Sequence, residues 1–336
     1  MALHAAEPMG TRPSGQGTRR VTARFRRDVT QTVAMTGRFA PSPTGALHVG
    51  NLRTALIAWL AARSAGERFV LRMEDLDRVT SSAAHERSQE RDLAAVGINW
   101  DGAVWRQSER FGVYDAAILR LTELGMTYDC FCSRREIREA VAAPHGPDTL
   151  VYPGTCRDLT REERIRRGRS RQPAVRFRAG PDFIAIDDAV AGRYERRAHD
   201  VVLRRNDGVP AYNVAVVIDD HAQGIDQVVR GDDLLSATPS QVAIAAALDI
   251  ASPGYVHVPL VVGESGERLA KRDGAITLDQ LASAGWDVDR VRAALAVSIG
   301  VAESGEAVTA AQLVGRFDLD RFASRAATPV ALENVL

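Results

Sequence analysis

A strand–loop–helix–strand pattern near the N-terminus limits the possible folds more than any other part of the sequence. A short strand is predicted over residues 36–40, and a loop rich in Pro and Gly follows it. Apolar residues at three- and four-residue spacing predict a helix over 51–64, and an apolar strand over 68–73 ends at Glu74 and Asp75. This unit is typical of a parallel sheet, in which ligands bind beyond the carboxyl ends of the strands. We therefore expect an α/β fold whose ligand site lies where the loop and Glu74 share one edge.

A second α/β segment follows much later in the chain. Strands are predicted over residues 201–203 and 228–230, and helices over 212–219 and 236–248. The intervening stretch holds all three cysteines and most of the arginine clusters, so we interpret it as an insertion. The expected segments are a disordered extension at 1–36, an α/β domain at 37–115 and 201–256, an insertion at 116–200, and a mainly helical region at 257–336.

The composition is that of a globular protein and excludes some functions. The 336 residues are 45% hydrophobic and 26% charged, and no apolar run is long enough to span a membrane. The formal net charge is zero, so no global charge attracts nucleic acid and any RNA contact must be local. The arginine-rich stretch 161–171 is either such a contact or a solvated helix face, because Glu162 and Glu163 lie within it.

The first 36 residues are rich in Arg, Thr and Ser and show no hydrophobic period. They lack the continuous apolar core of a secretory signal. An organelle transit peptide is the alternative, but we expect a disordered extension. Met35 directly precedes the first structured pattern, so residues 1–34 are expected to be dispensable.

The loop between the first strand and the first helix has features of a phosphate site. Prolines stiffen it, and it delivers His48, Gly50 and Asn51 to the start of the helix. A helix start presents unpaired N–H groups and the positive end of a dipole, which suit phosphate. His48 can donate a hydrogen bond to charge developing on a phosphoryl group, and Gly50 lets another molecule approach the backbone closely. A histidine shortly before a glycine is by itself more often structural, so a functional role for His48 must be judged from the longer motif around it.

Two ordered motifs carry a resemblance to a known family. The string Pro41-Ser42-Pro43-Thr44-Gly45-x-Leu47-His48-x-Gly50 resembles the first signature of class I glutamyl-tRNA synthetases. The loop Arg268–Arg272 resembles their second signature, with Arg268 in place of its first lysine and Ala270 in place of its serine. Lys271 stands at the catalytic second-lysine position. It is the only lysine among the 43 Lys and Arg residues of the chain, which argues against chance.

The resemblance implies a Rossmann-type parallel sheet of class I synthetases and an adenylation reaction. A carboxylate of glutamate would attack the α-phosphate of ATP, with Mg²⁺ shared among the ATP oxygens. His48 and Lys271 would be the catalytic residues, and ATP would contact His48, Gly50, Asn51 and Lys271. The family correspondence gives the glutamate pocket as Arg38, Phe39, Ala40, Pro41, Ser42, Glu74, Tyr212 and Arg230.

Within this pocket, Arg230 is expected to clamp the γ-carboxylate bidentately with help from Tyr212, and Glu74 to meet the α-ammonium. For any one of these residues the alternative is an ordinary surface salt bridge. Val216 stands where the larger enzymes carry an asparagine that helps to hold glutamate, so weaker glutamate binding is expected.

The three cysteines indicate a metal site in the insertion. Cys130-x-Cys132 and Tyr152-x₃-Cys156 are closely grouped, and zinc takes four ligands with thiolates preferred in structural sites. On ligand rules alone the fourth ligand is Tyr152, water, His145 or Asp158. The Cys-x-Cys and Tyr-x₃-Cys pattern resembles the zinc site of a truncated synthetase paralogue, which implies one structural Zn²⁺ held by Cys130, Cys132, Tyr152 and Cys156.

The length after the second signature indicates which branch of the family the chain resembles. Only 65 residues (336 minus 271) follow Lys271, too few for a large anticodon-binding part. The chain therefore resembles the glutamyl-queuosine tRNA(Asp) synthetases. This resemblance implies glutamate activation without tRNA and transfer to queuosine in the anticodon of tRNA(Asp), with residues 257–336 as a region like the stem-contact part of the parent enzymes. Arg134, Arg135 and Arg138 are candidate RNA contacts.

Three alternatives remain at the level of the sequence. The chain can be a shortened glutamyl-tRNA synthetase that charges tRNA 3′ ends. It can be a non-catalytic, zinc-containing RNA-binding paralogue. It can also be another nucleotidyltransferase, which should lack the Glu74, Tyr212 and Arg230 pocket. A cytoplasmic monomer without membrane contact is expected.

Overall fold

The computed structural model describes residues 21–24, 36–141, 151–262, 276–326 and 330–331. The predicted second-signature loop with Arg268, Ala270 and Lys271 lies outside these residues. Among the helices of the described ranges, none is long and apolar enough to cross a membrane.

A five-stranded parallel sheet forms the centre of the molecule, in the order β11-β10-β2-β3-β4. Its strands are β2 (Thr36–Phe39), β3 (Phe69–Met73), β4 (Trp105–Arg106), β10 (Ile225–Gly231) and β11 (Gly254–Val258). The predicted α/β fold with a parallel sheet is confirmed. The predicted strands at 36–40, 68–73 and 228–230 are β2, β3 and β10.

Alternate residues of the strands pack into two hydrophobic cores, one on each face of the sheet. Phe69 and Leu71 of β3 belong to one core, and Val70 between them belongs to the other. The first core includes α1 (Val49–Ser64), and the second includes α3 (Phe111–Glu123), α6 (Tyr212–Ala222) and α7 (Thr238–Ala247). Helix α2 (Ala83–Ala95) lies beside the loop that follows β2. The sheet is therefore covered on both faces, as parallel sheets require.

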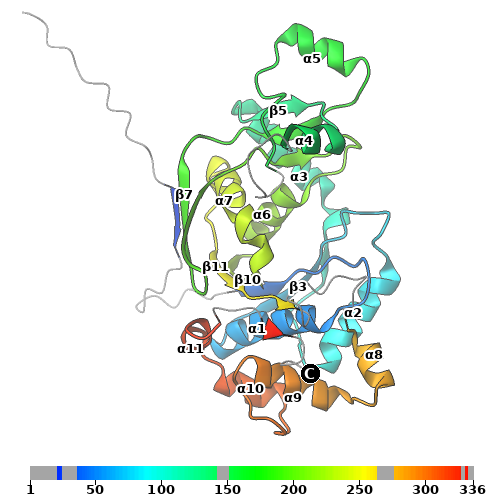
Figure 1. Cartoon of the computed structure of the whole chain (residues 1–336), viewed down its shortest axis with the longest axis vertical. Coiled ribbons are helices and arrows are strands. Elements are labelled where there is room, and N and C mark those ends of the chain that lie inside the picture. Colours follow the sequence, from blue (N-terminus) through cyan, green and yellow to red (C-terminus); the bar gives the residue numbers. More distant parts are fainter. Residues whose placement is uncertain (1–20, 25–35, 142–150, 263–275, 327–329, 332–336) are drawn as a thin grey trace, which may run out of the picture.

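Part of the segment between α3 and α6 extends from one end of the molecule (Figure 1). It contains the antiparallel sheet β5-β6-β9, with β5 (Thr127–Cys130), β6 (Ala174–Phe177) and β9 (Val202–Arg204), together with α4 (Arg134–Val141) and α5 (Arg161–Gly168). The strand that we predicted at 201–203 is thus present as β9, but it pairs with β6 and not with the parallel sheet. Helix α5 contains no buried residue, so the arginine-rich stretch is exposed at the tip.

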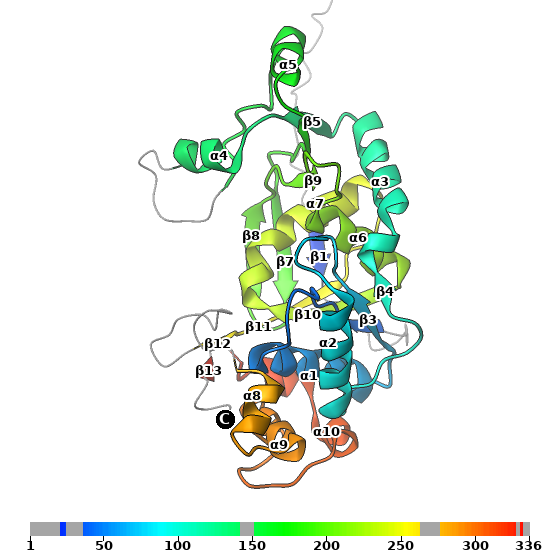
Figure 2. The same cartoon turned by 90° about the vertical axis from the view of Figure 1, so that its right-hand side faces the viewer.

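A third sheet has the order β1-β7-β8, with β1 (Val21–Arg24), β7 (Phe183–Asp188) and β8 (Gly192–Arg197). Strands β7 and β8 form a hairpin, and β1 adds in parallel to the free edge of β7 (Figure 2). The prediction of disorder for 1–36 is therefore wrong for Val21–Arg24 and for Thr36 of β2. The physical reason for β1 is the open edge of β7, whose unpaired backbone groups accept another strand.

The C-terminal region is mainly helical, as predicted. It comprises α8 (Leu278–Ser283), α9 (Val288–Ser298), α10 (Ala310–Arg316) and α11 (Leu319–Ala323), with a short strand pair of β12 (Val261–Val262) and β13 (Val330–Ala331). These helices lie at the opposite end from α4 and α5 (Figures 1 and 2). Their apolar residues join the core around α1, so this region completes the first core and forms no core of its own.

Candidate active site

A cavity of about 640 Å³ opens at the carboxyl ends of β2, β3 and β10. This is the edge at which the sequence placed the ligand site. Every predicted glutamate residue and every predicted ATP residue that the structure describes lines this cavity; Lys271 falls outside the described ranges. The residues from the prediction are Arg38, Phe39, Ala40, Pro41, Ser42, His48, Gly50, Asn51, Glu74, Tyr212 and Arg230.

The loop between β2 and α1 forms one wall and is fastened by its neighbours. The side chain of Gln89 on α2 donates to the carbonyls of Ser42 (3.0 Å) and Gly45 (2.8 Å). The backbone N–H of Glu74 donates to the carbonyl of Pro41 (2.9 Å). The loop and Glu74 are therefore held in a fixed relation to each other, although about thirty residues separate them in sequence.

His48 caps the N-terminus of α1, where the sequence predicted a phosphate site. Its Nδ1 accepts the N–H of Asn51 (3.3 Å), and its own N–H donates to Asn51 Oδ1 (3.3 Å). In the neutral ring the proton therefore resides on Nε2. A Cβ at Gly50 would lie 3.1 Å from Nδ1 and Cε1 of His48. Gly50 thus leaves room for the imidazole itself, a role that the sequence interpretation did not foresee.

Arg230 at the end of β10 is buried and held by neutral groups. Its Nε donates to His257 Nε2 (3.0 Å), and its Nη2 donates to Thr238 Oγ1 (2.8 Å) and Gln241 Oε1 (2.9 Å). Its Nη1 donates to the Tyr212 hydroxyl (3.4 Å), in the only one of these bonds that is not fully buried. Within the ranges that the structure describes, Arg230 forms no ion pair with a carboxylate.

This arrangement changes the expected clamp. We expected the fork of Arg230 to bind a γ-carboxylate bidentately. The protons of Nε and Nη2 are already donated to protein acceptors, so only Nη1 remains for a ligand beside Tyr212. A carboxylate in the cavity would therefore meet Nη1 and the Tyr212 hydroxyl together.

Behind Arg230 lies a buried His257–Asp188 pair. Nδ1 of His257 is 2.6 Å from Asp188 Oδ2, and both side chains have no exposed surface. Burial lowers the pKa of His257 and outweighs the opposite effect of Asp188, so the ring is neutral at physiological pH. Burial raises the pKa of Asp188, but the hydrogen bonds from His257 and the backbone more than offset this, so the carboxylate is ionised.

A second buried arginine, Arg72 on β3, has the opposite surroundings. Its Nη2 is 2.7 Å from Asp220 Oδ1 and 3.7 Å from Glu74 Oε1, and its Nε is 3.8 Å from Asp219 Oδ2. Arg38 also contacts Asp220, with Nε 3.3 Å from Oδ1. Burial raises the pKa of Glu74 to about 7, despite the nearby charges of Arg72 and Arg38.

Asp219 joins this network to residues of the segment 107–114. It accepts from Arg110 Nε (2.7 Å), the Tyr114 hydroxyl (2.7 Å) and Gln107 Nε2 (3.2 Å). These residues are therefore connected through Asp219 and Arg72 to Glu74, which lines the cavity.

Sequence reasoning missed Arg72, Asp188 and His257. Arg72 and His257 are single polar residues within apolar strands, which is a signal for a buried network. Asp188 carried no such signal, because its partner lies 69 residues away.

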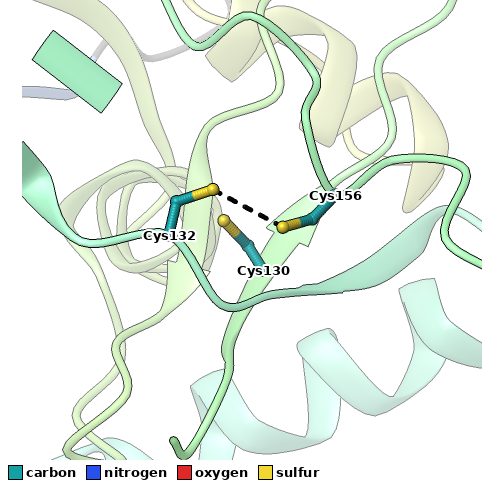
Figure 3. Close-up of side chains that lie close together, drawn as sticks. All are labelled: Cys130, Cys132 and Cys156. Carbon is teal, nitrogen blue, oxygen red and sulfur yellow. Dashed lines mark hydrogen bonds between the residues drawn. The ribbon is translucent and has the colours of Figure 1, made fainter. Parts of the chain in front are cut away.

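The three cysteines meet at the end of β5 (Figure 3). Their Sγ atoms all lie within 4.8 Å of one another, and those of Cys132 and Cys156 are 3.5 Å apart. The Tyr152 hydroxyl lies 3.4 Å from Cys130 Sγ and 3.8 Å from Cys132 Sγ. Asp158, one alternative ligand, instead pairs with Arg178 at 3.0 Å, and His145 falls outside the described residues.

These distances fit a tetrahedral zinc site. A Zn–S bond of about 2.3 Å requires sulfur atoms about 3.8 Å apart, and a Zn–O bond of about 2.0 Å requires S–O separations of about 3.5 Å. The Tyr152 ring also lies under Arg176, whose guanidinium carbon is 3.7 Å from the ring centroid. The cluster is therefore compatible with a zinc site, with the Tyr152 oxygen at the position of a fourth ligand.

Comparison with known proteins defines the class. The family described as tRNA synthetases class I (E and Q), catalytic domain, matches residues 34–328, and the chain belongs to this family. It is a ligase of the aminoacyl-tRNA synthetase type.

The curated relatives are more specific. The chain is 55% identical over 271 residues to the glutamyl-Q tRNA(Asp) synthetase of Nocardia farcinica, covering 80% of this chain and 86% of that protein. It is 50% identical over 269 residues to the protein of the same name from Cutibacterium acnes, covering 80% and 76%. The resemblance predicted from the two signatures is confirmed.

Solved structures show the same fold. A glutamate tRNA ligase from Elizabethkingia meningosepticum, solved in complex with its amino acid, superposes with a TM-score of 0.75 at 26% identity. The alignment covers 90% of this chain and 68% of that one. The similarity of fold thus extends over most of this chain.

Proposed function

We propose that this protein activates glutamate as glutamyl-adenylate with ATP, without needing tRNA, and transfers the glutamate to queuosine in the anticodon of tRNA(Asp). The relatives named glutamyl-Q tRNA(Asp) synthetase support both the amino acid and the acceptor. Both the ATP and the tRNA that this reaction needs are present in the cytoplasm, where we expect the protein to act as a monomer.

The observation that carries the first step is the charge arrangement of the cavity. Arg230 is a buried cation without a carboxylate partner among the described residues, and a buried charge of this kind is costly unless a ligand compensates it. Glu74 is a largely buried carboxylate whose pKa is raised to about 7, so a cation would stabilise its ionised form. An amino acid with a carboxylate side chain supplies both partners, with the side chain at Arg230 and the α-ammonium at Glu74.

ATP would take the part of the cavity next to α1. The backbone at the start of α1 and the Nε2 proton of His48 are suited to phosphate, with Gly50 and Asn51 keeping the imidazole in place. Lys271 would approach the leaving phosphates as a point charge. Mg²⁺ bound with ATP would neutralise part of the phosphate charge. With the glutamate α-carboxylate aligned on the α-phosphate, the reaction depends mainly on positioning.

The cysteine cluster would hold one structural zinc ion, with Cys130, Cys132, Tyr152 and Cys156 as ligands. The cluster lies away from the cavity in both sequence and fold, so we assign it no part in the adenylation chemistry. Its expected role is to fix the end of β5 against the chain around Cys156, where the small third core is too limited to do so alone.

The acceptor is tested with radiolabelled glutamate and three RNAs. We expect label on tRNA(Asp) that carries queuosine, and none on the same tRNA with guanosine at that position or on tRNA(Glu). Label on tRNA(Glu), or on both forms of tRNA(Asp) alike, would instead support a shortened glutamyl-tRNA synthetase that acts at the 3′ end. Absence of all adenylate formation would support a non-catalytic RNA-binding protein.

A further inference from the structure

The orientation of Arg230 depends on a hydrogen-bond chain that begins in the β7–β8 hairpin. Asp188 at the end of β7 accepts the N–H groups of Val190 and Ala191 (2.9 and 2.8 Å), so its carboxylate is fixed by the turn. It also accepts the backbone N–H of His257 (3.1 Å to Oδ2) and lies 2.6 Å from the His257 ring. The chain therefore connects a hairpin outside the parallel sheet to the wall of the cavity.

The direction of each hydrogen bond in this chain is determined. Arg230 has only donors, so His257 Nε2 must accept from its Nε. The ring proton then resides on Nδ1 and is donated to Asp188, whose carboxylate can only accept. The Thr238 hydroxyl, 3.2 Å from the same Nε2, is compatible with this tautomer, because its single proton can be donated either to Nε2 or to the Leu234 carbonyl, also at 3.2 Å. Asp188 thus selects the one tautomer that leaves a lone pair facing Arg230.

We propose that His257 and Asp188 are positioning residues that determine side-chain specificity in the amino-acid site. They hold the guanidinium so that Nη1 alone faces the cavity, and this fixes where a side-chain carboxylate must end. The proposal rests on the proposed function, since it assumes that Arg230 meets the side-chain carboxylate of glutamate.

The chemistry of the chain suits this role. A carboxylate in direct contact with Arg230 would satisfy its charge and compete with the substrate. Neutral His257 instead separates the Asp188 charge from Arg230, so the guanidinium is oriented but its charge is left for a ligand. An uncharged acceptor at the position of Nε2 is therefore what the site needs, and a second donor there would oppose the Arg230 Nε–H.

Two substitutions of His257 separate its two ring nitrogens. In His257→Gln the side-chain oxygen reaches the position of Nε2 and can still accept from Arg230. In His257→Asn the shorter amide reaches only the position of Nδ1, so it can still donate to Asp188 but leaves Arg230 Nε unpaired. Both variants remove the imidazole, so they are matched controls for each other.

The experiment measures KM and kcat for glutamate in tRNA-independent ATP–pyrophosphate exchange, with thermal unfolding of each variant. We expect His257→Asn to raise KM for glutamate about tenfold, which corresponds to about 1.4 kcal/mol, and to leave kcat within about threefold of the wild type. We also expect this variant to discriminate less between glutamate and glutamine. His257→Gln should remain within about threefold of the wild type in KM. A purely structural role would lower the unfolding temperature of both variants and leave the amino-acid preference unchanged.

A second substitution tests the tautomer. In Asp188→Asn the new amide can donate to Nδ1, which moves the ring proton to Nε2 and places it against Arg230. We expect a rise in KM for glutamate comparable to that of His257→Asn. The inference is overturned if folded His257→Asn and Asp188→Asn both keep the wild-type KM and amino-acid preference while Arg230→Gln loses glutamate activation. If Arg230→Gln also keeps the wild-type KM, the proposed function itself fails.

Discussion

The two arginines buried beside the cavity, Arg72 and Arg230, lie on strands of the same sheet but have opposite surroundings. Arg72 has Asp219, Asp220 and Glu74 within 4.0 Å and no exposed surface. Arg230 lines the cavity and is surrounded by a hydroxyl, an amide, an imidazole and a phenol, and its Nη1 keeps a donor for a ligand. Arg72 is therefore neutralised by the protein itself, whereas Arg230 is oriented by the protein and left without a counter-charge.

This difference indicates that Arg72 holds the fold together, whereas Arg230 is available to bind a ligand. Asp219 and Asp220 lie on α6 and Glu74 directly follows β3, so these carboxylates and Arg72 hold the strand and the helix together. The neutral groups around Arg230 leave its charge for a ligand. Two residues of the same type, both buried, are thus expected to respond differently to substitution, one in stability and the other in binding.

The largest expected effect is on stability at Arg72. Arg72→Met leaves Asp220 buried without its nearest cation, and breaking such a pair costs about 3–5 kcal/mol. Urea unfolding of the variant measures this loss. Arg63→Ala is the matched control, because its pair with Asp101 (2.7 Å) is partly exposed and should contribute about 1 kcal/mol or less. Equal losses in the two variants would contradict a special role for the Arg72 network.

The next effect is on glutamate binding at Arg230. Arg230→Gln removes the charge but keeps an amide that can donate to the neutral neighbours. We expect KM for glutamate to rise about 100-fold, equivalent to about 2.7 kcal/mol, with a change in unfolding free energy of about 1 kcal/mol or less. Pyrophosphate exchange and urea unfolding measure the two quantities. A large loss of stability with little change in KM would place Arg230 in the same class as Arg72.

The pH dependence of glutamate binding reports on Glu74. Its pKa of about 7 means that protons compete with the α-ammonium as the pH falls. Between about pH 8 and about pH 6, the affinity for glutamate should decrease about tenfold, because only the ionised carboxylate attracts the ammonium. Titration calorimetry across this range measures it. Glu74→Gln should bind glutamate weakly and without this pH dependence; a wild-type affinity that is constant over the range would argue against Glu74 as the ammonium partner.

The smallest effect on the cavity is expected from the cysteine cluster. We expect about one zinc per chain in the purified protein and about none in Cys132→Ser. Loss of zinc should lower the unfolding temperature and expose the insertion to proteolysis, while KM for glutamate changes less than about threefold, because the cluster lies in a separate small core. Wild-type protein with well below one zinc per chain would refute the metal assignment.

The sequence predicted the parts of the site that follow from general rules or from signatures. A parallel sheet brings the ends of its strands to one edge, so the loop with His48, Glu74 and the end of β10 at Arg230 were expected there. The cysteine grouping was also visible, because its members lie within one short stretch of the chain.

The partners of Arg230 and Arg72 could not be predicted in the same way. Asp188 meets His257 only because the β7–β8 hairpin packs against β11, and no periodicity encodes such a contact. We expected a bidentate clamp from the fork geometry of the arginine side chain. In the structure, Nε and Nη2 of Arg230 already donate to His257, Thr238 and Gln241. The pairing of β1 with β7 likewise depends on an open edge that only the fold creates.

The central claim is that the uncompensated Arg230 and the largely buried Glu74 form a site for an amino acid with an acidic side chain. The most direct test is ATP–pyrophosphate exchange without tRNA, measured with each proteinogenic amino acid in turn. We predict exchange with glutamate that exceeds exchange with aspartate or glutamine by at least about tenfold. Exchange of equal rate with glutamine, or none with glutamate while another amino acid is activated, would contradict the account.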